Sequence, residues 1–149
     1  MPSIEQAIQQ LTFKSSLHRA QVNIVYTSAW LNQMTAKTLK PFGLSLQQFN
    51  ILRILRGRAG KPATIKLLTE RMLDKMSNAS RLVDKLKEKE LVDRQECPTD
   101  RRQVDIVITR SGLDLIQRAS DAAEGKRSKV FQRISDDEAA TLRLSLIHI

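Results

Sequence analysis

The sequence predicts a mainly α fold with one small β-hairpin, and three observations support this fold class. Apolar residues recur at helical spacing in the first 40 positions, and two short helical segments with capping residues follow. A stretch near residue 105 alternates apolar and polar residues, as strands do. The length of 149 residues suits one domain, and the sequence contains no repeats or low-complexity linkers.

A long helix is predicted from Ser16 to Leu39, because apolar residues are spaced there by three, four and seven positions. The predicted apolar face comprises Leu17, Ala20, Ile24, Leu31 and Met34. Pro41 ends the helix, since the residue before a proline disfavours helical backbone. Ser45 and Gln48 form a capping box that begins the next helix.

That next helix is expected to stop near residues 57–60, which include two glycines. Residues 61–63 are predicted to be an extended connector, and Thr64 to cap a short helix. A further helix begins at a cap formed by Asp74 or Ser77. Its narrow apolar stripe comprises Met76, Ala79, Leu82, Val83 and Leu86.

Two strands are predicted over Leu91–Gln95 and Gln103–Ile108, joined by a connection with Pro98 and Asp100 as turn formers. Thr109 caps a long helix that runs to about residue 133, and a second capping box at residues 135–138 opens a last helix. Short helices followed by a two-stranded hairpin are the element order of a winged helix-turn-helix.

The charge distribution favours a polyanionic partner. The chain carries a net charge of +9, and residues 53–110 hold 15 Lys and Arg against 9 acidic residues. A basic excess on a helix-turn-helix suits nucleic acid. The alternative is a basic surface that only keeps the chain soluble.

The helix after residue 76 is predicted to be the recognition helix, which enters the major groove of double-stranded DNA. Small side chains near its start allow the backbone to approach the bases, and asparagine can pair bidentately with adenine. Arginine reaches guanine or phosphate, and a lysine one turn further on reaches phosphate. The alternative is an ordinary amphipathic surface helix. The DNA contacts predicted on this helix are Ser77, Asn78, Ser80, Arg81 and Lys85.

From about residue 42 to 115 the sequence resembles the MarR family of bacterial transcription regulators. The resemblance is carried by GLSLQQFNILRIL, LLTERMLDKMSNASRLVDKLKEKELVDRQ and PTDRRQVDIVITRSG. The last stretch is similar to the wing of that family, with an Asp-x-Arg pair, a strand and a Thr-x-x-Gly helix start. Two departures are Glu90, where the family usually has glycine, and the end RLSLIHI, where the last helix normally runs on.

The resemblance implies a single domain over residues 1–149. In it, residues 43–109 form the winged helix-turn-helix, and residues 1–42 and 110–149 form helical dimerisation segments. It also implies a homodimer on a pseudo-palindromic operator, most simply a repressor. A small aromatic or anionic effector, or oxidation, would then change the spacing of the two recognition helices.

By the same resemblance, Asp100 and Arg102 form the Asp-x-Arg pair of the wing. Asp100 would orient an arginine through a carboxylate–guanidinium pair, and Arg102 would enter the adjacent minor groove. Arg101 is expected to contact phosphate. The alternative for this segment is a solvated hairpin tip.

Possible effector contacts are Tyr26 and Trp30 on the long first helix, although core or dimer packing explains both equally well. Cys97 is expected to be a passive thiol; the alternative is a redox-responsive regulator, because Arg101 and Arg102 could lower the pKa of the thiol. A further alternative for the whole chain is a winged-helix module that binds another protein.

Enzymatic, metal-dependent and membrane functions are not expected. The sequence lacks HExxH, CxxC and Gly-rich phosphate-loop motifs, and His18 and His148 have no metal-ligand neighbours, so we expect no metal and no cofactor. Acidic residues 136–138 suit the first turn of a helix. A single cysteine, no secretion signal and no long apolar run favour the cytoplasm.

Overall fold

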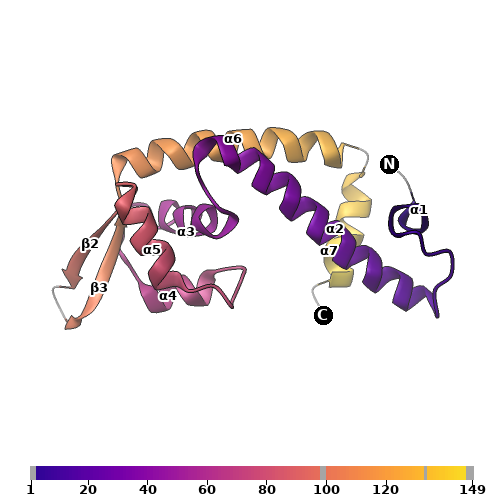
Figure 1. The fold of residues 1–149 in the computed structure, drawn as a ribbon, viewed down its shortest axis with the longest axis horizontal. Helices are drawn as coiled ribbons and strands as arrows, with labels where there is room; N and C mark the ends of the chain where they lie inside the picture. Colours follow the sequence, from indigo (N-terminus) through magenta and orange to yellow (C-terminus); the bar gives the residue numbers. More distant parts are fainter. Residues whose placement is uncertain (1–2, 98–99, 133, 147–149) are drawn as a thin grey trace.

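The computed structural model describes residues 3–97, 100–132 and 134–146; for residues 96, 97, 100–103 and 127 it describes the backbone alone. The mainly α fold with a small sheet is confirmed (Figure 1). The described elements are α1 (Ile4–Ile8), α2 (Ser16–Leu39), the 3₁₀-helix η1 (Lys40–Phe42), α3 (Leu46–Arg56), β1 (Ala63–Thr64), α4 (Ile65–Arg71), α5 (Ala79–Glu88), β2 (Val92–Cys97), β3 (Asp100–Ile108), α6 (Arg110–Phe131) and α7 (Asp136–Leu146).

Local capping signals place most helix starts where the sequence predicts them. The Ser45 hydroxyl accepts the backbone N–H of Gln48 at 3.1 Å, and the Gln48 side chain accepts the Ser45 N–H at 3.2 Å. Thr64 caps α4, and Thr109 caps α6. The box at residues 135–138 is present at the start of α7. The predicted bounds of α2 agree with the structure.

Besides the short 3₁₀-helix η1, two elements were not predicted. The connector at residues 61–63 ends in β1, which pairs antiparallel with β3 through Ala63 and Ile106 and makes the sheet three-stranded, in the order β1-β3-β2. The N-terminal helix α1 begins with its own capping box from Ser3 and Gln6. A two-residue strand carries no sequence period, so only its partner strand reveals it.

The predicted start of the recognition helix was wrong. Neither Asp74 nor Ser77 caps α5, because Asn78 occupies the N-cap and its side chain accepts the backbone N–H of Arg81 at 3.0 Å. Met76, which was assigned to the apolar stripe, precedes the helix and is 94% exposed. The buried stripe is therefore restricted to Ala79, Val83 and Leu86, with Leu82 partly buried against the core.

The hydrophobic core lies in the winged end of the molecule and is centred on α3. In Figure 1, α3 lies between α6 on one side and α4 and α5 on the other. Ile51, Leu52 and Leu55 of α3 are fully buried, together with Leu86 of α5 and Ile116 of α6. This arrangement buries the apolar stripe of α5 and leaves the opposite side of the helix exposed to solvent.

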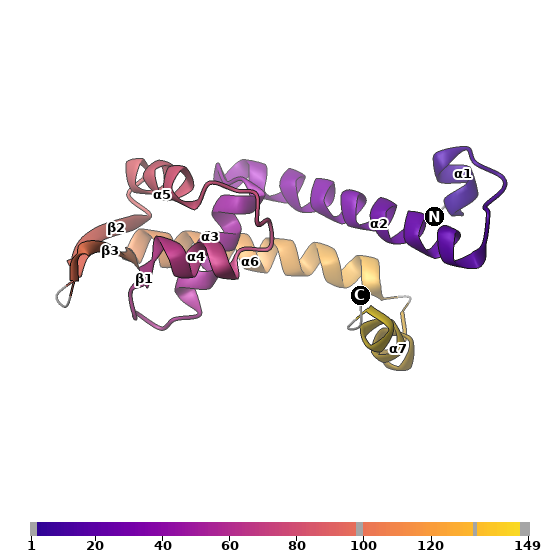
Figure 2. The ribbon, with the colours of Figure 1, turned by 90° about the horizontal axis from the view of Figure 1, so that it is seen from below.

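The helices α2 and α6 extend away from the winged end toward α1 and α7 (Figure 2). Large apolar side chains are exposed along this part, including Leu17 at 80% and Val25 at 65%. None of the residues of α7 is buried. The terminal helices thus present apolar surface that the described chain does not cover.

The end of α5 takes a backbone conformation that suits glycine. Glu90 has a φ of +58°, in the left-handed region. The N–H of Leu91 reaches back to the carbonyl of Leu86 at 3.0 Å, as in a Schellman motif. The carbonyl of Glu90 accepts the Thr109 hydroxyl at 2.8 Å. The C-terminal end of α5 therefore has the backbone geometry that glycine usually provides, although the residue at this position is Glu90.

We expect Glu90→Gly to raise the free energy of unfolding by about 0.5–1 kcal/mol, because glycine adopts this conformation without steric cost. Urea denaturation followed by circular dichroism measures the change. Glu88→Gly is the control, since Glu88 is helical and glycine there should lower stability by a similar amount. Equal losses in both variants would contradict the account.

Candidate nucleic-acid interface

The exposed side of α5 carries the residues predicted to contact a polyanion. Asn78, Ser80, Arg81 and Lys85 are exposed, whereas Ala79, on the opposite side, is buried. Small residues at the start of the helix leave its backbone accessible, and the two cations follow at one-turn spacing. The structure thus brings these predicted residues together on one surface.

The capping role of Asn78 limits what its side chain can bind. Its amide oxygen accepts the Arg81 N–H, so only its NH₂ group remains to donate. A bidentate pair with adenine requires both the oxygen and the nitrogen. Forming that pair would therefore cost the helix its cap. With the cap intact, Asn78 can donate a single hydrogen bond.

The loop that precedes α5 is held to α3 by polar contacts. The carboxylate of Asp74 accepts the Ser77 hydroxyl at 2.7 Å, the Met76 N–H at 3.1 Å and the Gln47 amide of α3 at 3.3 Å. These bonds, that of Ser77 first, then Gln47 and Met76, hold the pKa of Asp74 below its ordinary value. Ser77 is half-buried, and its hydroxyl is committed to Asp74.

The β2–β3 hairpin projects beside α5 as a wing (Figure 1). Its strands are longer than predicted, because β2 reaches Cys97 and β3 begins at Asp100. Arg101 and Arg102 therefore lie in β3 rather than in the connection. They occupy the register break where the pairing changes from Glu96 with Val104 to Cys97 with Asp100. Pro98 and Thr99 lie outside the described residues.

An ion pair ties the wing to the recognition helix. The guanidinium of Arg94 in β2 lies 2.5 Å from the carboxylate of Asp84 in α5. Asp84 lies one turn from Ser80 and Arg81, so this contact fixes the orientation of the exposed side of α5 relative to the hairpin. No local sequence pattern indicates this ion pair, because Asp84 and Arg94 belong to different elements.

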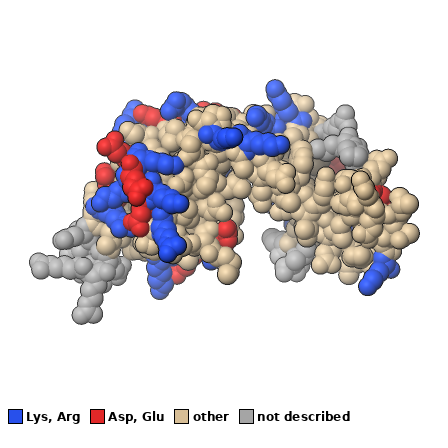
Figure 3. Space-filling view, viewed as in Figure 1, with Lys and Arg blue, Asp and Glu red and all other residues tan. Residues whose placement is uncertain are grey.

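Charged side chains are concentrated over the winged end. Figure 3 shows Lys, Arg, Asp and Glu crowded over α5 and the neighbouring strands, whereas the end formed by α2 and α7 is largely uncharged on this face. The basic excess at residues 53–110 therefore lies where the recognition helix and the hairpin are.

Close packing fixes the start of α6 to the base of the hairpin. The sequence pattern alone gives no physical reason for the glycine found there. The Thr109 hydroxyl accepts the Gly112 N–H at 3.0 Å and donates to the Glu90 carbonyl at 2.8 Å. A Cβ added to Gly112 would lie 2.2 Å from the backbone oxygen of Leu91. The Thr-x-x-Gly stretch is therefore required by close packing between α6 and the segment entering β2.

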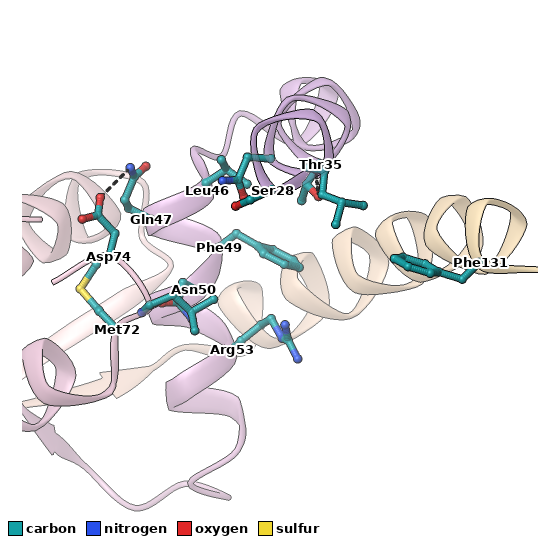
Figure 4. Close-up of a pocket in the computed structure, with 13 residues that line it drawn as sticks. Ser28, Thr35, Leu46, Gln47, Phe49, Asn50, Arg53, Met72, Asp74 and Phe131 are labelled. Carbon is teal, nitrogen blue, oxygen red and sulfur yellow. Dashed lines mark hydrogen bonds between the residues drawn. The ribbon is translucent and has the colours of Figure 1, made fainter. Parts of the chain in front are cut away.

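A pocket of about 680 Å³ lies between α2, α3 and the loop after α4 (Figure 4). Its polar wall includes Asn32 and Thr35 of α2 and Gln47 and Asn50 of α3. Its apolar lining includes Phe49, Met72 and Phe131, and the guanidinium of Arg53 lies 5.8 Å from the ring centre of Phe49. The pocket therefore combines aromatic surface, amides, the cation of Arg53 and the carboxylate of Asp74.

The aromatic residues proposed as effector contacts do not line this pocket. Tyr26 is 40% exposed on α2 and Trp30 is partly buried, but the α2 residues of the pocket are Ser28, Leu31, Asn32 and Thr35. The pocket draws on four separate segments, so no local pattern indicates it. His18 accepts the Lys14 N–H, and His148 lies outside the described residues.

Comparison with known proteins supports the fold and matches part of the chain to one family. A profile of the MarR family matches residues 42–103, which contain α3 to β3 except for the last residues of that strand. The HTH-type transcriptional regulator YsmB of Bacillus subtilis is 26% identical over 141 residues, covering 93% of this chain and 95% of YsmB. The part of the chain from α3 to the start of β3 thus matches the MarR family.

Solved structures agree with this MarR fold over nearly the whole chain. AbsC, a MarR family regulator from Streptomyces coelicolor, matches with a TM-score of 0.78 and 22% identity, over 91% of this chain and 93% of AbsC. The organohalide-sensing regulator RdhR-CbdbA1625, in its 2,4-dichlorophenol-bound form, matches with a TM-score of 0.80 and 20% identity, over 99% of this chain and 83% of that chain. At these identities the likeness establishes the fold.

The described helices include none with the length and apolar character needed to cross a membrane.

Proposed function

We propose that this chain is a DNA-binding transcription regulator of the MarR family, and that it is a ligand-responsive repressor that binds a pseudo-palindromic operator as a homodimer. The observation that carries the proposal is the exposed, polar side of α5 beside the hairpin, with Arg81 and Lys85 on that side. The α5 helix enters the major groove, and the hairpin lies over the adjacent minor groove.

The terminal helices are the proposed dimer interface. Leu17, Val25, Leu142 and Leu144 are exposed on α2 and α7, far from the core of the winged end. Exposed apolar surface of this extent marks an association site. A second copy of the chain places two recognition helices on one side of the DNA, which a pseudo-palindromic operator requires.

The roles of the α5 side chains can be separated by mutation. We expect Arg81→Ala and Ser80→Ala to change which duplexes are bound, because these residues contact bases. We expect Lys85→Ala to weaken binding to all duplexes, because this residue contacts phosphate. A lost base contact costs about 1–3 kcal/mol at one position, whereas a lost phosphate contact reduces the salt slope by about one.

The measurement is fluorescence anisotropy on a selected operator and on a random duplex, each over a salt titration. Lys66→Ala, an exposed lysine on α4, serves as the charge-matched control for Lys85→Ala. If Arg81→Ala loses the same affinity on the operator and on the random duplex, Arg81 is not a base contact.

The pocket is the proposed effector site, in place of a cleft at Tyr26 and Trp30. Phe49 and Phe131 offer aromatic surface, and Arg53 offers a positive charge, which suits a small aromatic or anionic ligand. RdhR-CbdbA1625 was solved with 2,4-dichlorophenol bound. A ligand changes operator binding only if it binds the two conformations with different affinity. Titrating a phenol probe while recording operator affinity tests this role.

A further inference from the structure

The pocket and the start of the recognition helix share residues. Gln47 and Asn50 line the pocket from α3, and Leu73 and Asp74 line it from the loop before α5. The Asn50 side chain accepts the backbone N–H of Leu73 at 2.9 Å, and the Gln47 amide donates to Asp74 at 3.3 Å. Figure 4 shows the Gln47–Asp74 contact at the edge of the pocket.

We infer that Gln47 and Asn50 are positioning residues for the recognition helix, so that the wall of the pocket also holds the loop that delivers α5 to DNA. The inference rests on the proposed function, and it adds a route by which a ligand in the pocket changes the affinity for DNA. We call the contacts of Gln47 and Asn50 with residues 73–74 the α3–loop contacts.

Apolar packing holds this loop weakly, which gives the α3–loop contacts their importance. Leu73 is 85% exposed and Met76 is 94% exposed, so the loop buries little beyond Met72. Segments with few buried apolar contacts open locally at low free-energy cost. The polar bonds to α3 are therefore the principal restraint on the loop between Met72 and Asn78.

Asp74 connects the α3–loop contacts to the start of α5. Asp74 receives the Gln47 amide on one side and the Ser77 hydroxyl on the other, and Asn78, next in the chain, caps the helix. A displacement of Asp74 thus moves the residues that begin the helix. A ligand that takes the amide of Asn50 or Gln47 into its own hydrogen bonds competes with the loop for the same atoms.

The test compares Asn50→Ala and Gln47→Ala with Asn32→Ala. Asn32 lines the same pocket from α2, so its replacement removes an amide of the same kind from the opposite wall. Two quantities are measured in the full-length protein. They are the hydrogen exchange of backbone amides in residues 73–77 and the dissociation constant for an operator selected from random duplexes.

In Asn50→Ala we expect the Leu73 amide to exchange at least about tenfold faster and the operator to bind at least about fivefold more weakly. Core amides of α3 such as that of Leu55 should keep wild-type protection, which separates loop release from unfolding. Gln47→Ala should act in the same direction, and Asn32→Ala should leave the exchange of the Leu73 amide unchanged, because Asn32 makes no hydrogen bond with the described residues of the loop.

Wild-type exchange in Asn50→Ala would overturn the inference, as would faster exchange with unchanged operator affinity, while the proposed function would stand. Equally fast exchange of the Leu73 amide in Asn32→Ala would also overturn it, because the effect would then belong to the pocket in general. If the wild-type protein enriches no duplex, the proposed function and the inference both fail.

Discussion

Replacing Gly112 by alanine is expected to lower the free energy of unfolding by about 3 kcal/mol or more, and so to remove most of the stability of the winged end. The added Cβ would lie 2.2 Å from the backbone oxygen of Leu91 and 2.8 Å from the Cγ1 atom of Ile108. Because the first of these atoms belongs to the backbone, no side-chain rotation relieves the contact. The start of α6 must move away from the base of the hairpin.

The consequence extends beyond stability. The same junction contains Thr109, whose hydroxyl caps α6 and donates to the carbonyl of Glu90. Displacing α6 therefore breaks the contact that fixes the end of the recognition helix. A Gly112→Ala protein that still folds at low temperature should bind DNA weakly.

Gly125→Ala provides a matched control in the same helix. A Cβ at Gly125 meets no atom within 4 Å, so alanine should raise stability by about 0.5–1 kcal/mol through its higher helix propensity. Urea denaturation of both variants, followed by circular dichroism, makes the comparison. Similar midpoints for the two variants would show that the close approach at Gly112 is absent in solution.

Replacing Arg102 by alanine is expected to weaken operator binding by at least about tenfold at near-physiological salt, since each lost specific contact costs about 1–3 kcal/mol. Arg102 lies in the outer part of β3, where the strand pairing changes register. An arginine at the end of a projecting hairpin reaches the minor groove, whose negative potential is greatest where A·T-rich sequence narrows it. The loss should therefore be largest on operators with A·T-rich flanks.

The protein should remain folded, because the core lies around α3 and not in this part of the hairpin. Asp100→Ala should act in the same direction but less, since it removes the carboxylate that the MarR resemblance implies would orient an arginine, and also one negative charge. Arg118→Ala removes the same charge from an exposed position on α6 and is the control. Unchanged affinity of Arg102→Ala over a full salt titration would exclude the wing as a DNA element.

The sequence allowed prediction of those elements that local chemistry determines. Capping boxes such as Ser45 with Gln48 act over three residues, so their sequence pattern is sufficient. The long apolar period similarly predicts α2 with correct bounds. The positive φ at Glu90 fits the glycine that the family usually places there, although the residue in this chain is glutamate.

The remaining features depend on contacts between distant segments. Asn78 rather than Asp74 caps α5, because Asp74 is held by Gln47, 27 residues away. The pairing of Ala63 with Ile106 and the clash that requires Gly112 also involve separate parts of the chain. The pocket is formed by residues from four segments, so no local pattern predicts it. The suggestion that Tyr26 and Trp30 contact an effector stays a prediction.

Selection of bound duplexes from a random pool tests the central proposal most directly, because it reports sequence preference and half-site geometry together. A dimer with two recognition helices should enrich inverted half-sites with centres about 10–10.5 base pairs apart, or a multiple of that spacing. Flanks under the wings should be enriched in A·T pairs. Enrichment of a single unrepeated motif would contradict the homodimer, and no enrichment above the starting pool would contradict sequence-specific recognition by α5.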